Sequence, residues 1–160
     1  MKVSTTDLCD AHPGVQVCAP ALVSFGGHLA FFGRVATVKV YEDNALVRTL
    51  LQRRGDARVL VVDGGGSLRC ALVGGQLGQF AVENGWAGLV VHGCVRDSVE
   101  LAAQPVGVLA LATHPRKSEK GLHGGREGGP VSFLGVTFRP GAWLYADADG
   151  VVVSDELLST

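Results

Sequence analysis

The chain has 160 residues, of which 47% are hydrophobic and 18% charged, and it carries a formal net charge of -1. A chain of this length and apolar content can bury a substantial core, which excludes disorder and predicts a single domain over residues 1–160. Because the basic side chains are few and scattered, direct binding to nucleic acid is not expected.

The sequence shows neither a targeting segment nor a metal-binding cysteine motif. The N-terminal residues lack an apolar signal, and no apolar run has the length of a membrane span, so a soluble cytoplasmic protein without a membrane partner is predicted. The histidines show no zinc-ligand spacing and no C-x-x-C pair occurs, which argues against a zinc site and a disulfide framework. Buried thiols are expected at Cys9, Cys18, Cys70 and Cys94.

Two helices and an extended segment are predicted first. Thr5 or Thr6 can cap a helix through Cys9, which Pro13-Gly14 would end. Residues 30–41 are rich in Val, Phe and Thr and predict one or two strands. The sequence Glu42-Asp43-Asn44 then places acids and an N-cap before a helix from Ala45 to about Arg53.

The segment Val59 to Val62 predicts a strand buried on both faces, and it leads directly into Asp63-Gly64-Gly65-Gly66. A nucleotide-binding glycine loop is not supported, because Arg69 stands where the third glycine belongs and no Walker lysine follows. A close-packed turn capped by Asp63 is predicted instead. For Arg69 we favour a structural ion pair.

The next segment predicts a helix and a strand with charged residues at the exit. A turn at Val73-Gly74-Gly75 precedes a helix from Gln76 to Asn84, a strand from Gly88 to His92 and a loop from Gly93 to Glu100. Ligands of open α/β sheets gather beyond the carboxyl ends of strands, and helix N-termini bind anions. This segment therefore predicts an anion and metal site, whereas His92 is expected to be a hydrogen-bonded core residue.

The last part of the chain predicts further strands around one polar loop. Leu101 to Ala112 predicts a connection into a buried strand, and Val131 to Phe138 is expected to be extended. The loop His114 to Pro130 carries several basic side chains, which fits either a solvated loop or a flap over an anionic ligand. Two more strands, at 143–146 and 151–153, are expected to flank a hairpin turn at residues 147–150.

An ordered set of short motifs from about residue 5 to residue 153 resembles the RraA-like family. This family includes the regulator of ribonuclease activity A and the metal-dependent 4-hydroxy-4-methyl-2-oxoglutarate/4-carboxy-4-hydroxy-2-oxoadipate aldolases. Each motif is weak by itself, and their order along the chain makes the resemblance specific. The motifs are Thr6-Asp7-Leu8-Cys9-Asp10, Phe25-Gly26-Gly27, Glu42-Asp43-Asn44, Val61-Val62-Asp63-Gly64-Gly65-Gly66-Ser67, Ala71-Leu72-Val73-Gly74, Asn84-Gly85-Trp86-Ala87-Gly88, His92-Gly93-Cys94-Val95-Arg96-Asp97, Gly135-Val136-Thr137-Phe138 and Tyr145-Ala146-Asp147.

The resemblance implies an α/β fold of the swivelling β/β/α type, with a mixed sheet core and flanking helices, assembled as a homotrimer with active sites at or near subunit interfaces. It also implies that Arg96 binds the carboxylate of a 2-oxo acid substrate, that Asp97 holds a divalent cation, Mg²⁺ or Mn²⁺, and that backbone amides of the turn Gly74, Gly75, Gln76 and Leu77 bind the same end of the substrate. Retro-aldol cleavage and oxaloacetate decarboxylation are the expected reactions.

These residue types suit that chemistry. A guanidinium matches a carboxylate bidentately, and a carboxylate is a hard oxygen ligand suited to Mg²⁺ or Mn²⁺. Glu100 is a candidate acceptor for metal-bound water. The cation would act as a Lewis acid that stabilises a pyruvate enolate.

The chain departs from the family at one position. Established aldolases usually carry an aspartate that twenty intervening residues separate from the arginine, where this chain has Gly75. The absence of that aspartate affects the retro-aldol step more than decarboxylation, which needs no base to begin. Glu100 either compensates for the missing aspartate or is an ordinary solvent-facing acid.

Two other functions remain open. Some members of the family inhibit ribonuclease E by binding it, and the best-known regulator lacks the Arg-Asp pair. Homologues have also been labelled menaquinone-biosynthesis methyltransferases, but this chain has no glycine-rich adenosine-binding unit with an acidic ribose partner.

Overall fold

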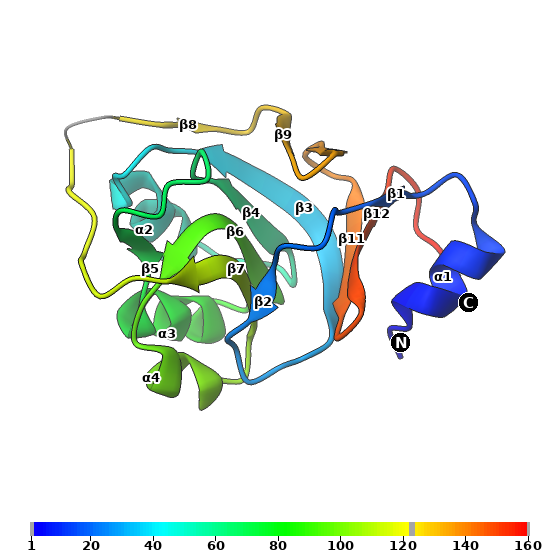
Figure 1. Cartoon of the computed structure of the whole chain (residues 1–160), viewed down its shortest axis with the longest axis horizontal. Coiled ribbons are helices and arrows are strands. Elements are labelled where there is room, and N and C mark those ends of the chain that lie inside the picture. The colour runs from blue at the N-terminus through cyan, green and yellow to red at the C-terminus, as the bar shows by residue number, and fades with distance from the viewer. Residues whose placement is uncertain (1, 122–123, 160) are drawn as a thin grey trace.

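The computed structural model describes residues 2–121 and 124–159. Short helices cover one side of a large, curled sheet (Figure 1). The helices are α1 (Thr5–Ala11), α2 (Ala45–Leu51), α3 (Gly75–Glu83) and α4 (Ser98–Ala102), and the strands are β1 (Gln16–Val17), β2 (Val23–Ser24), β3 (Phe31–Lys39), β4 (Val59–Asp63), β5 (Ala71–Val73), β6 (Gly88–Val95), β7 (Gly107–Thr113), β8 (Arg126–Glu127), β9 (Val131–Phe133), β10 (Val136–Phe138), β11 (Trp143–Asp147) and β12 (Gly150–Ser154).

The main sheet is mixed, with the order β1-β12-β11-β3-β4-β6-β7-β2. Strands β3, β4, β6 and β7 are parallel neighbours, and β5 adds to β6 in parallel, whereas the pairs β3–β11, β11–β12, β12–β1 and β7–β2 are antiparallel. The parallel strands align their carboxyl ends along one edge of the sheet. This edge is where binding sites form in open α/β sheets.

Both faces of the parallel strands are buried. Helices α2, α3 and α4 pack on one face through residues such as Val47, Leu77 and Leu101. The hairpin of β9 and β10 covers the other face through Phe133 and Phe138. All five residues of β4 are buried, as the apolar run in the sequence predicts.

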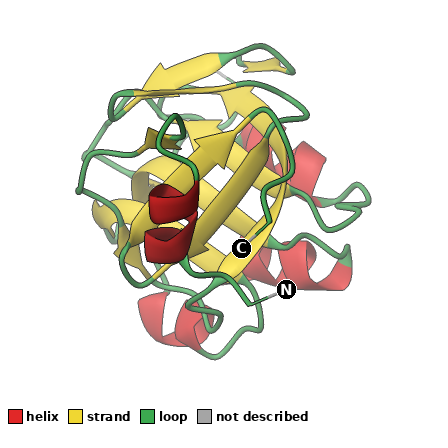
Figure 2. Cartoon of the chain, turned by 90° about the vertical axis from the view of Figure 1, so that its right-hand side faces the viewer, coloured by secondary structure: helices red, strands yellow, loops and turns green. Residues whose placement is uncertain are grey.

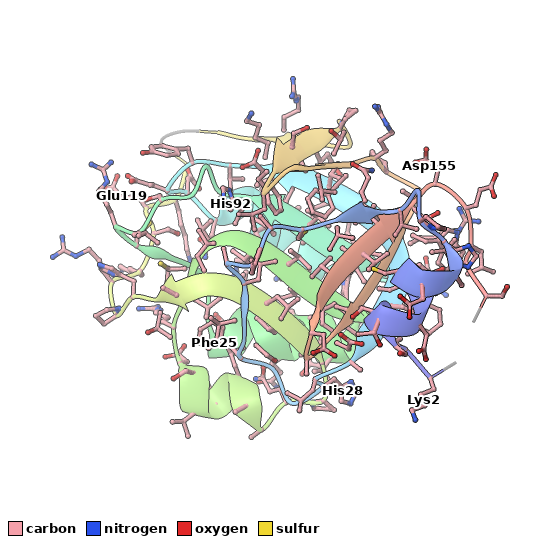
Figure 3. The ribbon with its side chains drawn as sticks, turned by 45° about the vertical axis from the view of Figure 1, so that its right-hand side comes forward. Lys2, Phe25, His28, His92, Glu119 and Asp155 are labelled. Atoms are coloured by element: carbon pink, nitrogen blue, oxygen red, sulfur yellow. The ribbon has the colours of Figure 1, made fainter. Side chains whose placement is uncertain are left out.

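A third, smaller core fixes the two terminal segments. Leu8 of α1 packs with Tyr145, Val152 and Leu158 on the far side of the antiparallel strands, and Figure 2 shows α1 lying across them. Figure 3 shows Lys2 and Asp155 together on this side of the molecule and Glu119 on the opposite side. The α/β fold with a mixed sheet and flanking helices is confirmed.

Three local predictions are wrong. The side chain of Ser4, rather than Thr5 or Thr6, caps α1 by accepting from the amide of Asp7. Residues 131–138 form a hairpin, because Leu134 and Gly135 both adopt positive φ and turn the chain between β9 and β10. The predicted loop 93–100 is largely regular, since β6 extends to Val95 and α4 begins at Ser98.

The polar segment 114–130 is tied to the rest of the fold at several points. The amide of Ala71 donates to the carbonyl of Arg116 at 2.8 Å, and the amide of Glu119 donates to the carbonyl of Glu42 at 3.2 Å. Strand β8, within the predicted loop, pairs with β3. Positions 122 and 123 of this loop lie outside the described residues.

All four cysteines have free thiols, as predicted. Three of them are buried and Cys9 is partly buried. Burial raises the pKa of the Cys18 thiol to about 12, so it stays protonated and unreactive at neutral pH.

Two glycines at the start of neighbouring parallel strands make room for one aromatic ring. A Cβ atom at Gly88 of β6 or at Gly107 of β7 would run into the ring of Phe31, which is 6% exposed. These strands therefore require glycine at these positions for steric reasons.

We predict that Gly88→Ala destabilises the protein by about 1–3 kcal/mol, since the added methyl group overpacks the core at the Phe31 ring. The free energy of unfolding in urea measures this. Gly14→Ala is the matched control, because a Cβ atom at Gly14 meets nothing within 4 Å. Equal unfolding free energies for the two variants would contradict the steric argument.

Candidate active site

The candidate site forms where β5 and β6 end side by side. The amide of Arg96, just beyond β6, donates to the carbonyl of Val73 in β5 at 2.9 Å. Beyond Val73 the chain turns at Gly74 into α3, and beyond Arg96 it turns at Asp97 into α4. The two strand-to-helix turns are therefore adjacent, and the sequence-predicted residues of both come together.

Asp97 links the two turns. Its Oδ2 atom accepts a hydrogen bond of 2.9 Å from the amide of Gly75, in the first turn of α3. Asp97 has a left-handed backbone, with φ 57° and ψ 44°, which short polar residues tolerate better than others. The positive end of α3 stabilises the negative carboxylate.

Arg96 and Asp97 both lie against Gly74. A Cβ atom at Gly74 would lie 2.7 Å from Oδ2 of Asp97 and 3.2 Å from Cγ of Arg96. Only glycine leaves space for both side chains here. The guanidinium-bearing side chain and the carboxylate consequently emerge next to each other from the same turn.

Glu100 takes the space that a side chain at position 75 would need. A Cβ atom at Gly75 would collide with the Glu100 carboxylate at Oε2. Although Glu100 is an exposed residue of α4, its carboxylate therefore rests on the first turn of α3. Glycine at 75 and glutamate at 100 are complementary in shape, and the carboxyl group of Glu100 lies where an aspartate at 75 would begin.

Other contacts fix the first turn of α3. The Gln104 amide donates to the carbonyl of Gly75 at 2.8 Å, and the Arg48 guanidinium donates to the side-chain carbonyl of Gln76 at 2.9 Å. Leu77 is buried in the helix-side core. Sequence reasoning missed Gln104 and Arg48, because no spacing or motif signals which distant side chain reaches this turn.

Asn44 also approaches from α2. Its side-chain amide donates to the carbonyl of Leu72 at 3.0 Å, whereas its Oδ1 atom is buried without a partner in the described structure. Asn44 makes no side-chain cap to α2, and the carboxylate of Asp43 accepts from the amide of Ala45 at 2.9 Å instead. The capping role predicted for this acidic segment thus belongs to Asp43.

The donor set suits a hard cation with a partial water shell. Asp97 and Glu100 supply carboxylate oxygens at one turn, and Mg²⁺ characteristically takes one or two protein carboxylates and keeps several waters. Within residues 2–121 and 124–159, no group of three or more His, Cys, Asp or Glu side chains is placed to hold a metal. A closed zinc site takes four protein ligands, whereas a pair of carboxylates is a donor set that Mg²⁺ or Mn²⁺ can accept.

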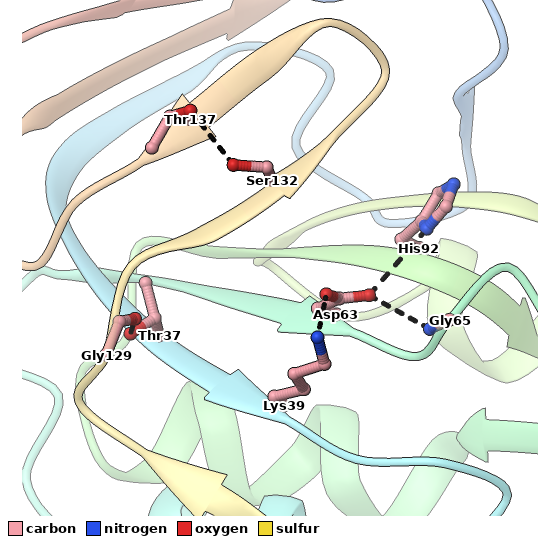
Figure 4. A network of polar contacts seen from close by, with 8 residues as sticks. All are labelled: Thr37, Lys39, Asp63, Gly65, His92, Gly129, Ser132 and Thr137. Carbon is pink, nitrogen blue, oxygen red and sulfur yellow. Dashed lines mark hydrogen bonds and ion pairs between the residues drawn. The ribbon is translucent and has the colours of Figure 1, made fainter.

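A separate polar row crosses the sheet at the ends of β3 and β4 and at a residue inside β6 (Figure 4). Lys39, Asp63 and His92 are register partners on adjacent strands. Asp63 accepts from the amide of Gly65 at 2.9 Å, which confirms the predicted cap of the glycine turn. Its carboxylate lies 3.8 Å from the Lys39 ammonium and 3.9 Å from Nδ1 of His92.

The prediction that His92 is a hydrogen-bonded core residue is wrong. Its ring stacks on Phe133 with centroids 4.5 Å apart, and its buried Nδ1 atom has no hydrogen-bond partner in the described structure. The side chain is 20% exposed. Burial lowers the pKa of the His92 imidazole, and the nearby carboxylate of Asp63 only partly opposes this effect.

Arg69 makes the predicted structural ion pair. Its Nε and Nη2 atoms donate to the two carboxylate oxygens of Glu42 at 2.6 and 2.7 Å, and the Ser67 hydroxyl donates to the same carboxylate at 2.8 Å. This bidentate pair closes the glycine turn. After Ser67 the chain continues to β5 instead of a helix, so β4 and its glycine turn do not form a dinucleotide-binding unit.

Comparisons with known proteins agree with this architecture. A protein of Laribacter hongkongensis, provisionally named 4-hydroxy-4-methyl-2-oxoglutarate aldolase, is 60% identical over 99% of both chains. One of Burkholderia multivorans with the same provisional name is 59% identical over 96% of this chain and 97% of the relative.

Two solved structures are also similar. One is described as the RNA-processing inhibitor RraA from Thermus thermophilis, with a TM-score of 0.95 and 50% identity over 99% of this chain and 96% of the other. The other is described as an S-adenosylmethionine:2-dimethylmenaquinone methyltransferase from Geobacillus kaustophilus, with a TM-score of 0.94 and 49% identity over 97% of this chain and 96% of the other.

The curled mixed sheet with few helices is thus that of the solved RraA structures. The family model described as RraA-like, Aldolase/RraA, matches residues 5–153. The chain belongs to the RraA-like family. Within the described residues, no helix is long and apolar enough to cross a membrane.

His92 makes stability depend on pH. Since its pKa is lower in the folded chain than in the unfolded chain, the unfolded state binds the proton first as the pH falls below about 6.5. We predict that the free energy of unfolding decreases between pH 7.5 and 5.5, and that His92→Gln reduces this decrease. Urea unfolding across this range measures both. His28→Gln removes an exposed histidine, so an equal change in that control would contradict the assignment to His92.

Proposed function

We propose that this protein is a divalent-metal-dependent C–C lyase for small 2-oxo acids, with oxaloacetate decarboxylation as its main reaction and retro-aldol cleavage of 4-hydroxy-4-methyl-2-oxoglutarate as a second one. The observation that carries the proposal is the convergence of Arg96, Asp97 and Glu100 on the glycine turn Gly74-Gly75. The provisional names of the relatives from Laribacter hongkongensis and Burkholderia multivorans support the lyase class.

Arg96 binds and orients the substrate carboxylate. Its guanidinium can form two parallel hydrogen bonds to the carboxylate, and its stem is fixed against Gly74. The amides of Gln76 and Leu77 lie in the first turn of α3, where no helical carbonyl stands four residues earlier to accept from them. They can therefore donate to the same substrate carboxylate, which the positive end of the helix also attracts. The amide of Gly75 already donates its hydrogen bond to Asp97.

Asp97 and Glu100 would hold the divalent cation, Asp97 directly and Glu100 through water. When bound, Mg²⁺ or Mn²⁺ supplies Lewis-acid stabilisation of the negative charge that develops on the ketone oxygen of the substrate. The hydrogen bond from the Gly75 amide fixes one oxygen of Asp97 and leaves the other carboxylate oxygen for a ligand. Position and charge of the carboxylate are thereby set before substrate binds.

The two reactions make different demands on Glu100. Decarboxylation begins with loss of carbon dioxide and requires no base. Retro-aldol cleavage requires that a proton leave the substrate hydroxyl group, and the Glu100 carboxylate, lying on Gly75, can accept it through a water molecule. Glu100 therefore takes the role of the aspartate that many aldolases of this family carry at the position of Gly75.

Assembly as a homotrimer in the cytoplasm is part of the proposal. Asp97 and Glu100 are exposed in the single chain, and a neighbouring subunit over this turn would exclude water and strengthen the interactions of the charged groups with substrate.

We predict that Arg96→Ala lowers kcat/KM for pyruvate release from oxaloacetate by about 100-fold or more, because two charge-assisted hydrogen bonds contribute about 3 kcal/mol or more. EDTA should abolish the metal-dependent rate and added Mg²⁺ or Mn²⁺ should restore it. Arg54→Ala, at an exposed ion pair with Asp56, is the control. Full turnover by Arg96→Ala would exclude the carboxylate-binding role.

We predict further that Glu100→Ala lowers the retro-aldol rate more than the decarboxylation rate. Gly75→Asp alone should be inactive and less stable, since the new side chain collides with Glu100. The double variant Gly75→Asp/Glu100→Ala should regain retro-aldol activity because one carboxylate replaces the other. Pyruvate release from both substrates measures the series. Unchanged rates in Glu100→Ala would mean that Glu100 is only a surface acid.

The alternative function is regulation of a ribonuclease by protein binding. The observation that favours it is the similarity to the RNA-processing inhibitor from Thermus thermophilis. Pull-down of a ribonuclease E-type partner, together with inhibition of RNA cleavage, tests this function. Inhibition by both the wild-type protein and Asp97→Ala, in the absence of lyase activity, would favour the regulator.

A methyltransferase function is not favoured, despite the described function of the similar Geobacillus kaustophilus protein. The glycine turn after β4 leads into β5, so no helix N-terminus follows it to bind an adenosine cofactor. Calorimetry with S-adenosylmethionine tests this directly, and no binding is expected.

A further inference from the structure

A cavity of about 310 Å³ lies away from the candidate active site. It is bordered by the end of α2, by residues of β3, by the amino end of β4 and by the segment after β8. The candidate active site lies beyond the carboxyl ends of β5 and β6. Since β4 and β6 are parallel, the cavity and the candidate site are at opposite ends of these strands.

Three arginines line this cavity: Arg34, Arg53 and Arg58. Two of them lie over aromatic rings. The Arg34 guanidinium lies 4.8 Å from the centroid of the Trp143 ring. The Arg58 guanidinium lies 4.9 Å from the centroid of the Trp86 ring. A cation–π contact of this kind restricts the motion of a guanidinium group and does not use its N–H donors.

Backbone carbonyls restrict the same two arginines further. Nη1 of Arg34 donates to Gly141 at 3.0 Å, and Arg58 donates from Nε to Gly55 at 2.9 Å and from Nη2 to Arg54 at 3.1 Å. A guanidinium has five N–H donors, so each of these arginines retains donors beyond the hydrogen bonds just described. Neutral carbonyl acceptors also leave the positive charges uncompensated.

Among the described residues of the cavity lining, Glu127 is the single acid, against the three arginines. It pairs with Arg53 at 3.2 Å, and both side chains of this pair are about half exposed, at 46% and 55%. Exposed pairs of this kind contribute little to stability. An incoming anion can therefore take the place of Glu127 on Arg53 at small cost, and the lining has a clear excess of positive charge.

The rest of the lining includes apolar groups. Leu50, Leu60 and Trp86 contribute to it, and all three are buried in the helix-side core. A ligand with a short carbon skeleton and more than one negative group would match both the apolar groups and the arginines. The volume admits a small metabolite and excludes a folded partner.

We propose that this cavity is a second binding site, for a small polyanion that carries phosphate or carboxylate groups. Arg34, Arg53 and Arg58 bind the negative groups, and the ligand displaces Glu127 from Arg53. The site is independent of the lyase chemistry at Arg96 and Asp97, and nothing in the proposal depends on that activity.

The two tryptophans of the chain both lie beneath arginines of the cavity, so their fluorescence reports binding. The test titrates the full chain with inorganic pyrophosphate and, separately, with propane-1,2,3-tricarboxylate, in EDTA without divalent cations. Fluorescence and calorimetry follow binding. We expect one molecule bound per chain for at least one of these probes, and the stronger probe identifies phosphate or carboxylate as the preferred group.

Four variants distinguish this site from general attraction between charges. Arg53→Gln should weaken binding about tenfold, because a charge-assisted hydrogen bond is lost. Glu127→Gln should strengthen binding, because the competing carboxylate disappears. Arg54→Gln, which removes a neighbouring charge that is 90% exposed and outside the cavity lining, should bind like the wild-type protein. Arg96→Ala should also bind like the wild-type protein.

Several results would overturn the proposal. These are no binding of either probe, the same loss for Arg54→Gln as for Arg53→Gln, no gain for Glu127→Gln, or a loss of binding in Arg96→Ala, which would place the anion at the candidate active site. The opposite signs expected for Arg53→Gln and Glu127→Gln separate ligand binding from mere rupture of their ion pair, since both substitutions break that pair.

Discussion

The hydrogen bond from the Gly75 amide to the Asp97 carboxylate is the interaction on which the candidate site depends. It joins two chain segments that leave adjacent parallel strands and would otherwise be independent turns. Because the acceptor is charged and the donor belongs to a helix N-terminus, the contact combines a charge-assisted hydrogen bond with the helix dipole. It places Arg96, Asp97 and the first turn of α3 in one fixed arrangement.

Two glycines shape this site because they have no side chain. At Gly74 the missing side chain makes room for Arg96 and Asp97, and at Gly75 it makes room for the Glu100 carboxylate. The Glu100 carboxylate thus lies where a side chain at position 75 would begin, although it belongs to a different helix. A carboxyl group can reach nearly the same place from position 75 or from position 100. This requires that the residue at the other position leave the space free.

Sequence patterns predicted the elements whose residues interact locally. The buried run of β4, the glycine turn capped by Asp63 and the hairpin between β11 and β12 follow from burial and turn chemistry. Long-range contacts were less accessible. Gln104 reaches Gly75, and Phe133 covers His92, only because separate segments pack together. The helix α4 was missed because its five residues follow a left-handed Asp97, which a pattern of hydrophobicity does not reveal.

The route of residues 16–24 has a consequence for how the chain folds. Strand β1 pairs with the C-terminal strand β12, whereas β2, only a few residues later, pairs with β7 at the opposite edge of the sheet. Such contacts between distant parts of a chain are entropically costly and slow. On the ribosome, β2 can pair once β7 has emerged, but β1 must wait for β12, so this sheet is completed only after Ser154 has been synthesised.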